Sequence, residues 1–169
     1  MNFLLFSMAL KPSASLLMGK LHVMDGKTSI ASYTATSGLV GYQEQKHQSW
    51  RGIGAMPECK KVGISRYSVL TEPYGRISNP EITDVFFSVN HPIRILVDGI
   101  WRAGFGIHFD SSIPGSSGCI IFRDKTEWNA FIQFMDDYAG KGFSSISLIV
   151  EYNASSSRES KIGTGRTYF

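Results

Sequence analysis

Cysteine is scarce in this chain, whose 169 residues include only Cys59 and Cys119. Two cysteines do not make a disulfide framework, and no Cys-x-x-Cys or Cys/His spacing predicts zinc, so no metal is expected. A bridge between the two is compatible with secretion. It would, however, block the thiol of Cys119, whose neighbours are typical of a reactive cysteine. The sequence therefore favours two free thiols, with Cys59 as a passive one.

Excess charge and long apolar runs are lacking too. The formal net charge is +3, and most of it comes from Arg158, Lys161 and Arg166 near the C-terminus. The remainder is too small for the dense basic face that binds nucleic acid, so no nucleic-acid partner is expected. No window approaches the roughly 20 apolar residues of a membrane span, so membrane insertion is not expected.

The apolar start of the chain, residues 1–10, has some features of a signal peptide. It lacks a basic n-region, however, and no small-residue cleavage site follows a long apolar block. A first β-strand, ended by Lys11-Pro12, is the favoured interpretation. We therefore expect a protein that is made in the cytoplasm and reaches any target outside it by another route.

What the chain does contain is glycine and aromatic residues, with 17 glycines and 12% aromatics. This composition favours one turn-rich, mainly β domain over residues 1–152, followed by a loosely ordered Ser/Gly-rich tail, 153–169. Asp-Gly pairs at 25–26 and 98–99 lie between apolar runs and predict two hairpins, the second with an arm that continues towards His108. Residues 37–66 are expected to form a long loop region. Further strands are predicted over residues 67–70, 84–89, 119–122 and 145–152.

One helix is expected, over residues 124–139. Asp124 is a good N-cap residue, and Glu127 stands three positions later, as in a capping box. The following apolar residues recur at helical spacing and predict one buried stripe. These residues are Trp128, Phe131, Ile132, Met135 and Tyr138.

The candidate catalytic residues lie in the segment from His108 to Cys119. The histidine ends an apolar strand, a Ser/Pro/Gly loop follows, and the cysteine opens a second apolar run. A thiolate needs a nearby base or cation, and a loop returning to a neighbouring strand would bring His108 to it. Gly118 allows a tight turn that aims backbone amides at an oxyanion, and Ser116 and Ser117 are suited to holding that turn. The alternative is a buried cysteine and an unrelated histidine at the end of a strand. The presence of both residues on either side of such a loop favours a catalytic role.

The motif resembles that of the L,D-transpeptidase catalytic domain (the YkuD type). The family form is Ile-His-Gly, a loop, and Ser-His-Gly-Cys-Ile-Arg. This chain has Ile-His-Phe at 107–109 and Ser-Ser-Gly-Cys-Ile-Ile at 116–121. Weaker similarity at 15–38 and at Ala55-Met56-Pro57 extends the resemblance over about residues 10–150.

The resemblance implies a mainly antiparallel β sandwich with one packed helix. It also implies that Cys119 attacks a peptidoglycan stem peptide at an amide between an L-centre and a D-amino acid. His108 would activate the thiol and then protonate the leaving amine. The thioester would pass to an amine or to water, and the amides of Gly118 and Cys119 would stabilise the oxyanion. No organic cofactor or metal is implied.

This chain departs from the family pattern in ways that bear on the reaction. Ser117 replaces histidine, Ile121 replaces arginine, and the loop from His108 to Cys119 is short. Without an evident export signal or wall-binding module, the sequence favours a wall hydrolase of phage-lysin or toxin type. The alternatives are a crosslinking L,D-transpeptidase, a non-catalytic wall-binding or particle-structural domain, and an unrelated cysteine protease.

Other residues complete the predicted site. Asp110 is a candidate to orient His108, and a backbone carbonyl is an equal one. Arg102 and Arg123 are candidate cations for a substrate carboxylate, although solvated surface positions are the commoner role of arginine. The aromatic residues Trp50, Trp101 and Phe87 suit either a peptide groove or the core. The predicted substrate-binding set is Ser116, Trp101, Arg102 and Arg123.

Overall fold

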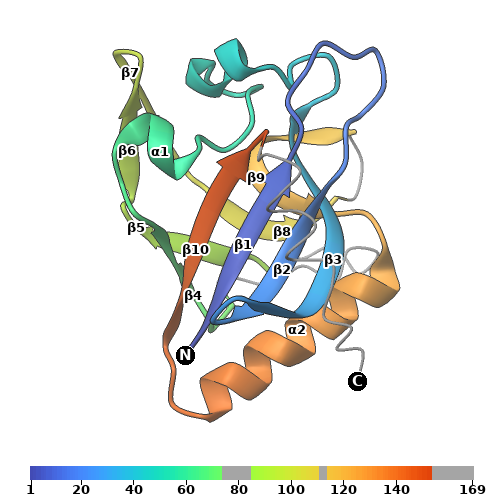
Figure 1. Ribbon diagram of the computed structural model, residues 1–169, viewed down its shortest axis with the longest axis vertical. Helices are drawn as coiled ribbons and strands as arrows, with labels where there is room; N and C mark the ends of the chain where they lie inside the picture. Colours follow the sequence, from blue (N-terminus) through green and yellow to red (C-terminus); the bar gives the residue numbers. More distant parts are fainter. Residues whose placement is uncertain (74–84, 111–113, 154–169) are drawn as a thin grey trace.

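The protein is described by a computed structural model over residues 1–73, 85–110 and 114–153 (Figure 1). Within these ranges, eight strands form a closed barrel in the order β1-β10-β4-β5-β8-β9-β3-β2. Their bounds are β1 (Asn2–Met8), β2 (Gly19–Asp25), β3 (Thr28–Leu39), β4 (Tyr67–Leu70), β5 (Phe87–His91), β8 (Gly106–Phe109), β9 (Gly115–Phe122) and β10 (Ser145–Tyr152).

The mainly β prediction is confirmed, but the sheet is closed on itself. Strand β1 pairs with β2 on one side and in parallel with β10 on the other, which leaves neither side of β1 as a free edge. The other parallel pair is β8–β9, and the remaining barrel pairs are antiparallel. Closure removes the unpaired backbone groups that an open sheet exposes. The expected sandwich of two sheets is therefore described more accurately as one barrel.

The barrel core follows the period-2 alternation of the strands. In β10, for example, Ile146, Leu148, Val150 and Tyr152 are buried, and the residues between them are more exposed. Inward residues of the other barrel strands join the same apolar cluster. This alternation explains why strand positions were readable in the sequence.

Helix α2 (Lys125–Gly140) lies across one end of the barrel (Figure 1). Its predicted apolar stripe enters the core cluster, with four of the five residues buried and Ile132 packed at the edge. The Asp124 side chain accepts a hydrogen bond from the Glu127 amide at 2.8 Å, so the predicted N-cap is confirmed. The stripe is aromatic-rich and packs against Phe87 and Phe122 of the barrel.

Replacing Asp124 by alanine is expected to lower the free energy of unfolding by about 1 kcal/mol, because the Glu127 amide loses its acceptor. Urea denaturation followed by circular dichroism measures the change. Asp136→Ala is the matched control, since Asp136 is an exposed carboxylate in the middle of the same helix. Equal losses in both variants would show that the cap contributes nothing.

Both Asp-Gly hairpins are present, but the second does not belong to the barrel. Strands β2 and β3 meet at Asp25 and Thr28, as predicted. Strands β6 (Arg94–Val97) and β7 (Ile100–Ala103) form a separate two-stranded sheet. The expected continuous arm towards His108 is wrong, because Gly104 adopts φ +77° and the chain turns before β8 begins.

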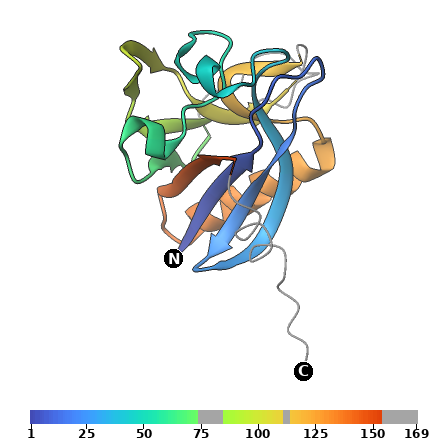
Figure 2. The ribbon, with the colours of Figure 1, turned by 45° about the horizontal axis from the view of Figure 1, so that its top comes forward.

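The predicted loop region 37–66 contains more structure than expected. Strand β3 runs to Leu39, and two short helices follow, η1 (Gln45–Ser49) and α1 (Cys59–Val62). The η1 segment and the β6–β7 hairpin lie at the end of the barrel away from α2 (Figure 2). The strand predicted over 84–89 is β5, which begins at Phe87. Its predicted first residue, most of the loop after Pro73 and the tail from residue 154 lie outside the described residues.

Candidate active site

His108 and Cys119 lie on neighbouring parallel strands. The register pairs Ile107 with Ile120 and His108 with Ile121. Ile107 and Ile120 point into the core, so His108 and Cys119, each one position away, lie on the other face of the β8–β9 pair. They are diagonal neighbours, and within the described chain no hydrogen bond joins them. Such pairs are often loose before substrate binds.

The cysteine is carried by a turn inside strand β9. Ser37 pairs with Ile120 and Leu39 with Gly115, so residues 116–119 stand opposite the single residue Gly38 and bulge from the ladder. We call residues 116–119 the cysteine turn. The predicted loop is therefore shorter than expected, because Gly115 to Gly118 belong to β9. Gly118 has φ +125°, a conformation that L-residues rarely adopt, so glycine is required there.

Ser116 holds the cysteine turn through its hydroxyl group. Its Oγ accepts hydrogen bonds from the amides of Gly118 and Gly38, both at 3.3 Å, and donates one to the Cys119 carbonyl. This is the local hydrogen bonding predicted for the serines. It also means that the Gly118 amide, predicted to be an oxyanion donor, is already bonded to Ser116.

Strand β3 fixes the turn from the other side. Ser37 Oγ donates to the Gly118 carbonyl at 3.2 Å and accepts from the Met56 amide at 2.8 Å. The side chain of Gln43 donates to the Ser37 carbonyl at 2.9 Å and is itself buried. The cysteine turn is thus anchored to a buried polar network, which restricts the positions of its backbone atoms.

Arg102 is buried beneath the cysteine turn, with 4% of its surface exposed. Its two terminal nitrogens donate four hydrogen bonds to backbone carbonyls, at 2.6–3.0 Å. The acceptors are Gln48, Ala55, Gly54 and Ser117. The position differs from both sequence interpretations: Arg102 is not solvated, and its terminal N–H groups bond backbone carbonyls of this chain.

The Cys119 thiol is partly buried, and its Sγ lies 3.6 Å from the Gly104 carbonyl. Burial raises the pKa of this thiol to about 11, against the opposing effects of a hydrogen bond from the Gly106 amide and the charge of Arg102. At neutral pH the thiol therefore keeps its proton. A nucleophilic Cys119 needs a base that removes this proton as it attacks.

His108 is held in an orientation that suits this base. Its Nδ1 lies 3.0 Å from the Phe109 carbonyl, and a carbonyl only accepts, so Nδ1 carries a proton; in the neutral ring, the lone pair is then on Nε2. The ring stacks on Phe86, with centroids 5.6 Å apart. Phe86 also lies directly over Gly106, where any Cβ would overlap its ring.

Phe86 was missed in the sequence. Its neighbour Phe87 was considered instead, for either a peptide groove or the core, and Phe87 is 1% exposed and belongs to the core. The signal was the alternation of the strand: if one of two adjacent residues points inward, the other points outward. Phe86 therefore faces His108, and Phe87 faces the core.

Asp110 does not bond to His108. Its carboxylate accepts from the Gly115 amide at 3.4 Å and forms an ion pair with Arg123, Nε to Oδ2, at 3.4 Å. Of the two candidates for orienting His108, the structure therefore favours a carbonyl, that of Phe109. The Arg123 guanidinium, predicted as a substrate cation, is half-exposed and engaged with Asp110.

The remaining predicted residues are dispersed. Trp101 is exposed on the face of β7 opposite to Arg102, where it stacks with Arg94 at 4.6 Å. The Ser117 side chain is exposed, and its carbonyl accepts from Arg102. Cys59 is a free, buried thiol that accepts a hydrogen bond from the Val150 amide at 3.4 Å, and its pKa is raised by burial. The two cysteines are thus not bridged.

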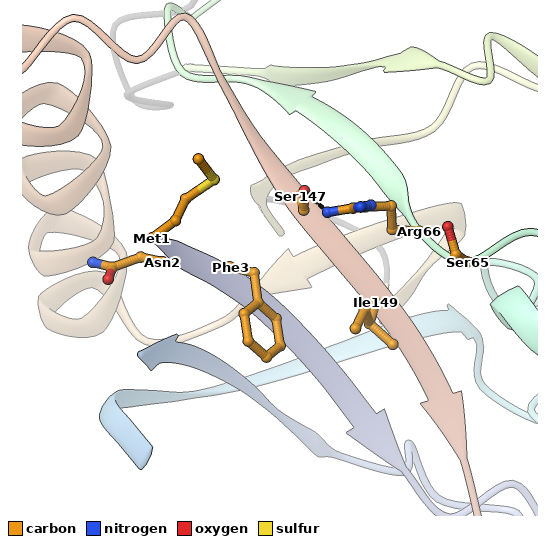
Figure 3. Close-up of a pocket in the computed structure, with 7 residues that line it drawn as sticks. All are labelled: Met1, Asn2, Phe3, Ser65, Arg66, Ser147 and Ile149. Carbon is orange, nitrogen blue, oxygen red and sulfur yellow. Dashed lines mark hydrogen bonds between the residues drawn. The ribbon is translucent and has the colours of Figure 1, made fainter. Parts of the chain in front are cut away.

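The described surface has pockets, but they lie elsewhere. One of ≈ 370 Å³ is open at the outer face of β1 and β10 (Figure 3). It is lined by Met1, Asn2, Phe3, Ser65, Arg66, Ser147 and Ile149. Two others lie beside the C-terminal end of α2 and beside α1. None of these three pockets includes a predicted site residue.

Over the described ranges, no group of three or more His, Cys, Asp or Glu side chains is arranged to hold a metal ion. Within the same ranges, no helix has the length and apolar character needed to cross a membrane. Comparison of the chain with protein-family models, with curated proteins and with solved structures gave no match.

Proposed function

We propose that this protein is a cysteine-nucleophile enzyme that hydrolyses the peptidoglycan stem peptide, with an L,D-transpeptidase-like fold. One observation carries the proposal. Cys119 stands on a turn anchored on both sides, next to the strand that carries His108, and the Phe109 carbonyl binds Nδ1 of His108, which leaves Nε2 as the acceptor of the neutral ring. The L,D substrate class comes from the resemblance of the His/Cys motif to that family.

In this mechanism His108 and Cys119 act together. As Sγ attacks the amide carbon, Nε2 of His108 takes the thiol proton, which a pKa of about 11 otherwise retains. The Cys119 amide donates to the oxyanion. The C–N bond then breaks, His108 returns the proton to the leaving amine, and a thioester remains. His108 then takes a proton from water as the water oxygen attacks the thioester carbon; the C–S bond breaks, and His108 returns the proton to Sγ of Cys119.

The assay uses the full chain with purified peptidoglycan fragments, and mass spectrometry identifies the products. Shortened stem peptides with one added water are expected. New crosslinks would instead indicate transpeptidation, and cleavage of all-L peptides an ordinary cysteine protease. If no product depends on Cys119, the protein is a non-catalytic wall-binding or particle-structural domain. A hydrolase of this kind, made in the cytoplasm, would reach the wall by another route, as phage lysins and injected toxins do.

A further inference from the structure

Arg102 is a buried cation whose bonded partners are all neutral. In the part of the chain that the structure describes, the ion pairs are Lys61–Asp98 and Arg123–Asp110, so no carboxylate neutralises Arg102. A buried charge is costly unless it is paired or its hydrogen bonds are satisfied. Four carbonyl acceptors satisfy the hydrogen bonds but leave the unit positive charge in place.

The groups around this charge belong to the cysteine turn and its supports. Nη2 bonds the Ser117 carbonyl at 3.0 Å, and the guanidinium lies over the Phe105 ring at 5.3 Å. A Cβ on Gly118 would overlap Nη2. The bonds to Gly54 and Ala55 tie this same group to the segment between η1 and α1, so Arg102 joins three separate parts of the chain.

Three titratable side chains face the guanidinium: Cys119 of β9, Tyr67 of β4 and Tyr152 of β10. Burial raises the pKa of both tyrosines, so they are neutral hydroxyls across the physiological range. Cys119 is the one that the proposed reaction ionises. The charge of Arg102 favours the thiolate and so opposes the effect of burial.

We propose that Arg102 is a positioning residue for the nucleophile: it holds the cysteine turn through the Ser117 carbonyl and supplies the positive charge that stabilises the Cys119 thiolate. The proposal rests on the proposed function, since it assigns Arg102 a part in that reaction. Ionisation of the Cys119 thiol is measured without substrate, however, so the role of Arg102 and the proposed enzyme activity are tested separately. If replacing Arg102 changes the ionisation of Cys119 but no wall cleavage occurs, only the role of Arg102 is supported. If cleavage occurs and the ionisation does not change, only the enzyme activity is supported.

The experiment measures iodoacetamide alkylation of Cys119 in the full chain from pH 7 to 9, with peptide mass spectrometry separating it from Cys59. The wild-type rate is expected to rise about tenfold per pH unit over this range, which lies below the thiol pKa of about 11. Arg102→Gln is expected to raise the thiol pKa and so to slow alkylation at each pH by about tenfold. Arg102→Lys keeps a positive charge over this range and is expected to retain most of the wild-type rate.

Arg94→Gln is the matched control, because Arg94 is an exposed arginine on the same hairpin. It should leave the alkylation rate of Cys119 unchanged. An unchanged alkylation rate in folded Arg102→Gln, or an equal loss of rate in the glutamine and lysine variants, would overturn the role of the charge.

A second measurement needs no change at Arg102. In the wild-type protein, the guanidinium ¹⁵N resonances of Arg102 are expected to shift as Cys119 ionises, and the shift should vanish in Cys119→Ser. Resonances that do not respond to the thiol would overturn the proposal even if Arg102→Gln fails to fold.

Discussion

Cys119→Ala is expected to abolish release of shortened stem peptides while leaving the thermal unfolding midpoint nearly unchanged. Removing the nucleophile of a thioester mechanism lowers the rate by on the order of 10⁴-fold or more, because the remaining groups cannot form the covalent intermediate. The Cys119 side chain is partly exposed, so its loss creates no closed cavity. Timed digestion of wall fragments, followed by mass spectrometry, measures the loss.

Cys59→Ala is the matched control for this experiment. Cys59 is 5% exposed and accepts a hydrogen bond from Val150, so its replacement should cost about 1 kcal/mol of stability but preserve cleavage. The opposite pattern, with Cys59→Ala inactive and Cys119→Ala active, would show that Cys59 and not Cys119 is the nucleophile. Full activity in both variants would remove cysteine catalysis altogether.

Gly118→Ala is expected to cause the second-largest effect, on both activity and stability. The residue would need φ +125°, and its new Cβ would overlap the Arg102 nitrogen and lie 3.1 Å from the Phe105 ring. Because four carbonyls hold Arg102, it has little freedom to move aside. Strain and overpacking together should cost about 3 kcal/mol. A displaced Cys119 should lower cleavage by about 10²-fold or more.

The control for Gly118→Ala separates backbone strain from collision. Gly26 also has a positive φ, +59°, but its missing Cβ has nothing within 4 Å. Gly26→Ala should therefore cost only the strain, about 1–2 kcal/mol, and keep full activity. Urea midpoints and cleavage rates of both variants give the comparison. If the two lose equal stability and Gly118→Ala stays active, the close packing of Arg102 on the turn is not important.

Local features of this fold were predictable from the sequence because they depend on near neighbours. The Asp-Gly hairpins and the Asp124 cap each involve residues a few positions apart, and the Trp128 stripe follows the helical period. The cysteine turn was predicted from its serine and glycine residues, and Gly118 does adopt the positive φ that a glycine allows.

Features that depend on distant segments were not predictable. The acceptors of Arg102 include carbonyls 47, 48 and 54 residues away in the chain, and backbone carbonyls leave no trace in a sequence. An arginine whose hydrogen-bond acceptors are all backbone carbonyls is therefore indistinguishable from a surface arginine until the fold is known. The same holds for barrel closure, which pairs the first strand with the last.

That pairing of β1 with β10 has a consequence for synthesis of the protein on the ribosome. Strand β1 is made first and β2 soon after, but its second neighbour is made only after most of the domain. The barrel therefore cannot close until β10 leaves the exit tunnel, and one edge of β1 stays open until then. Strand β10 also pairs with β4, so one edge of β4 stays open for as long. We therefore expect chains truncated before β10 to expose two unpaired strand edges, at β1 and β4, and to aggregate more readily than the intact chain.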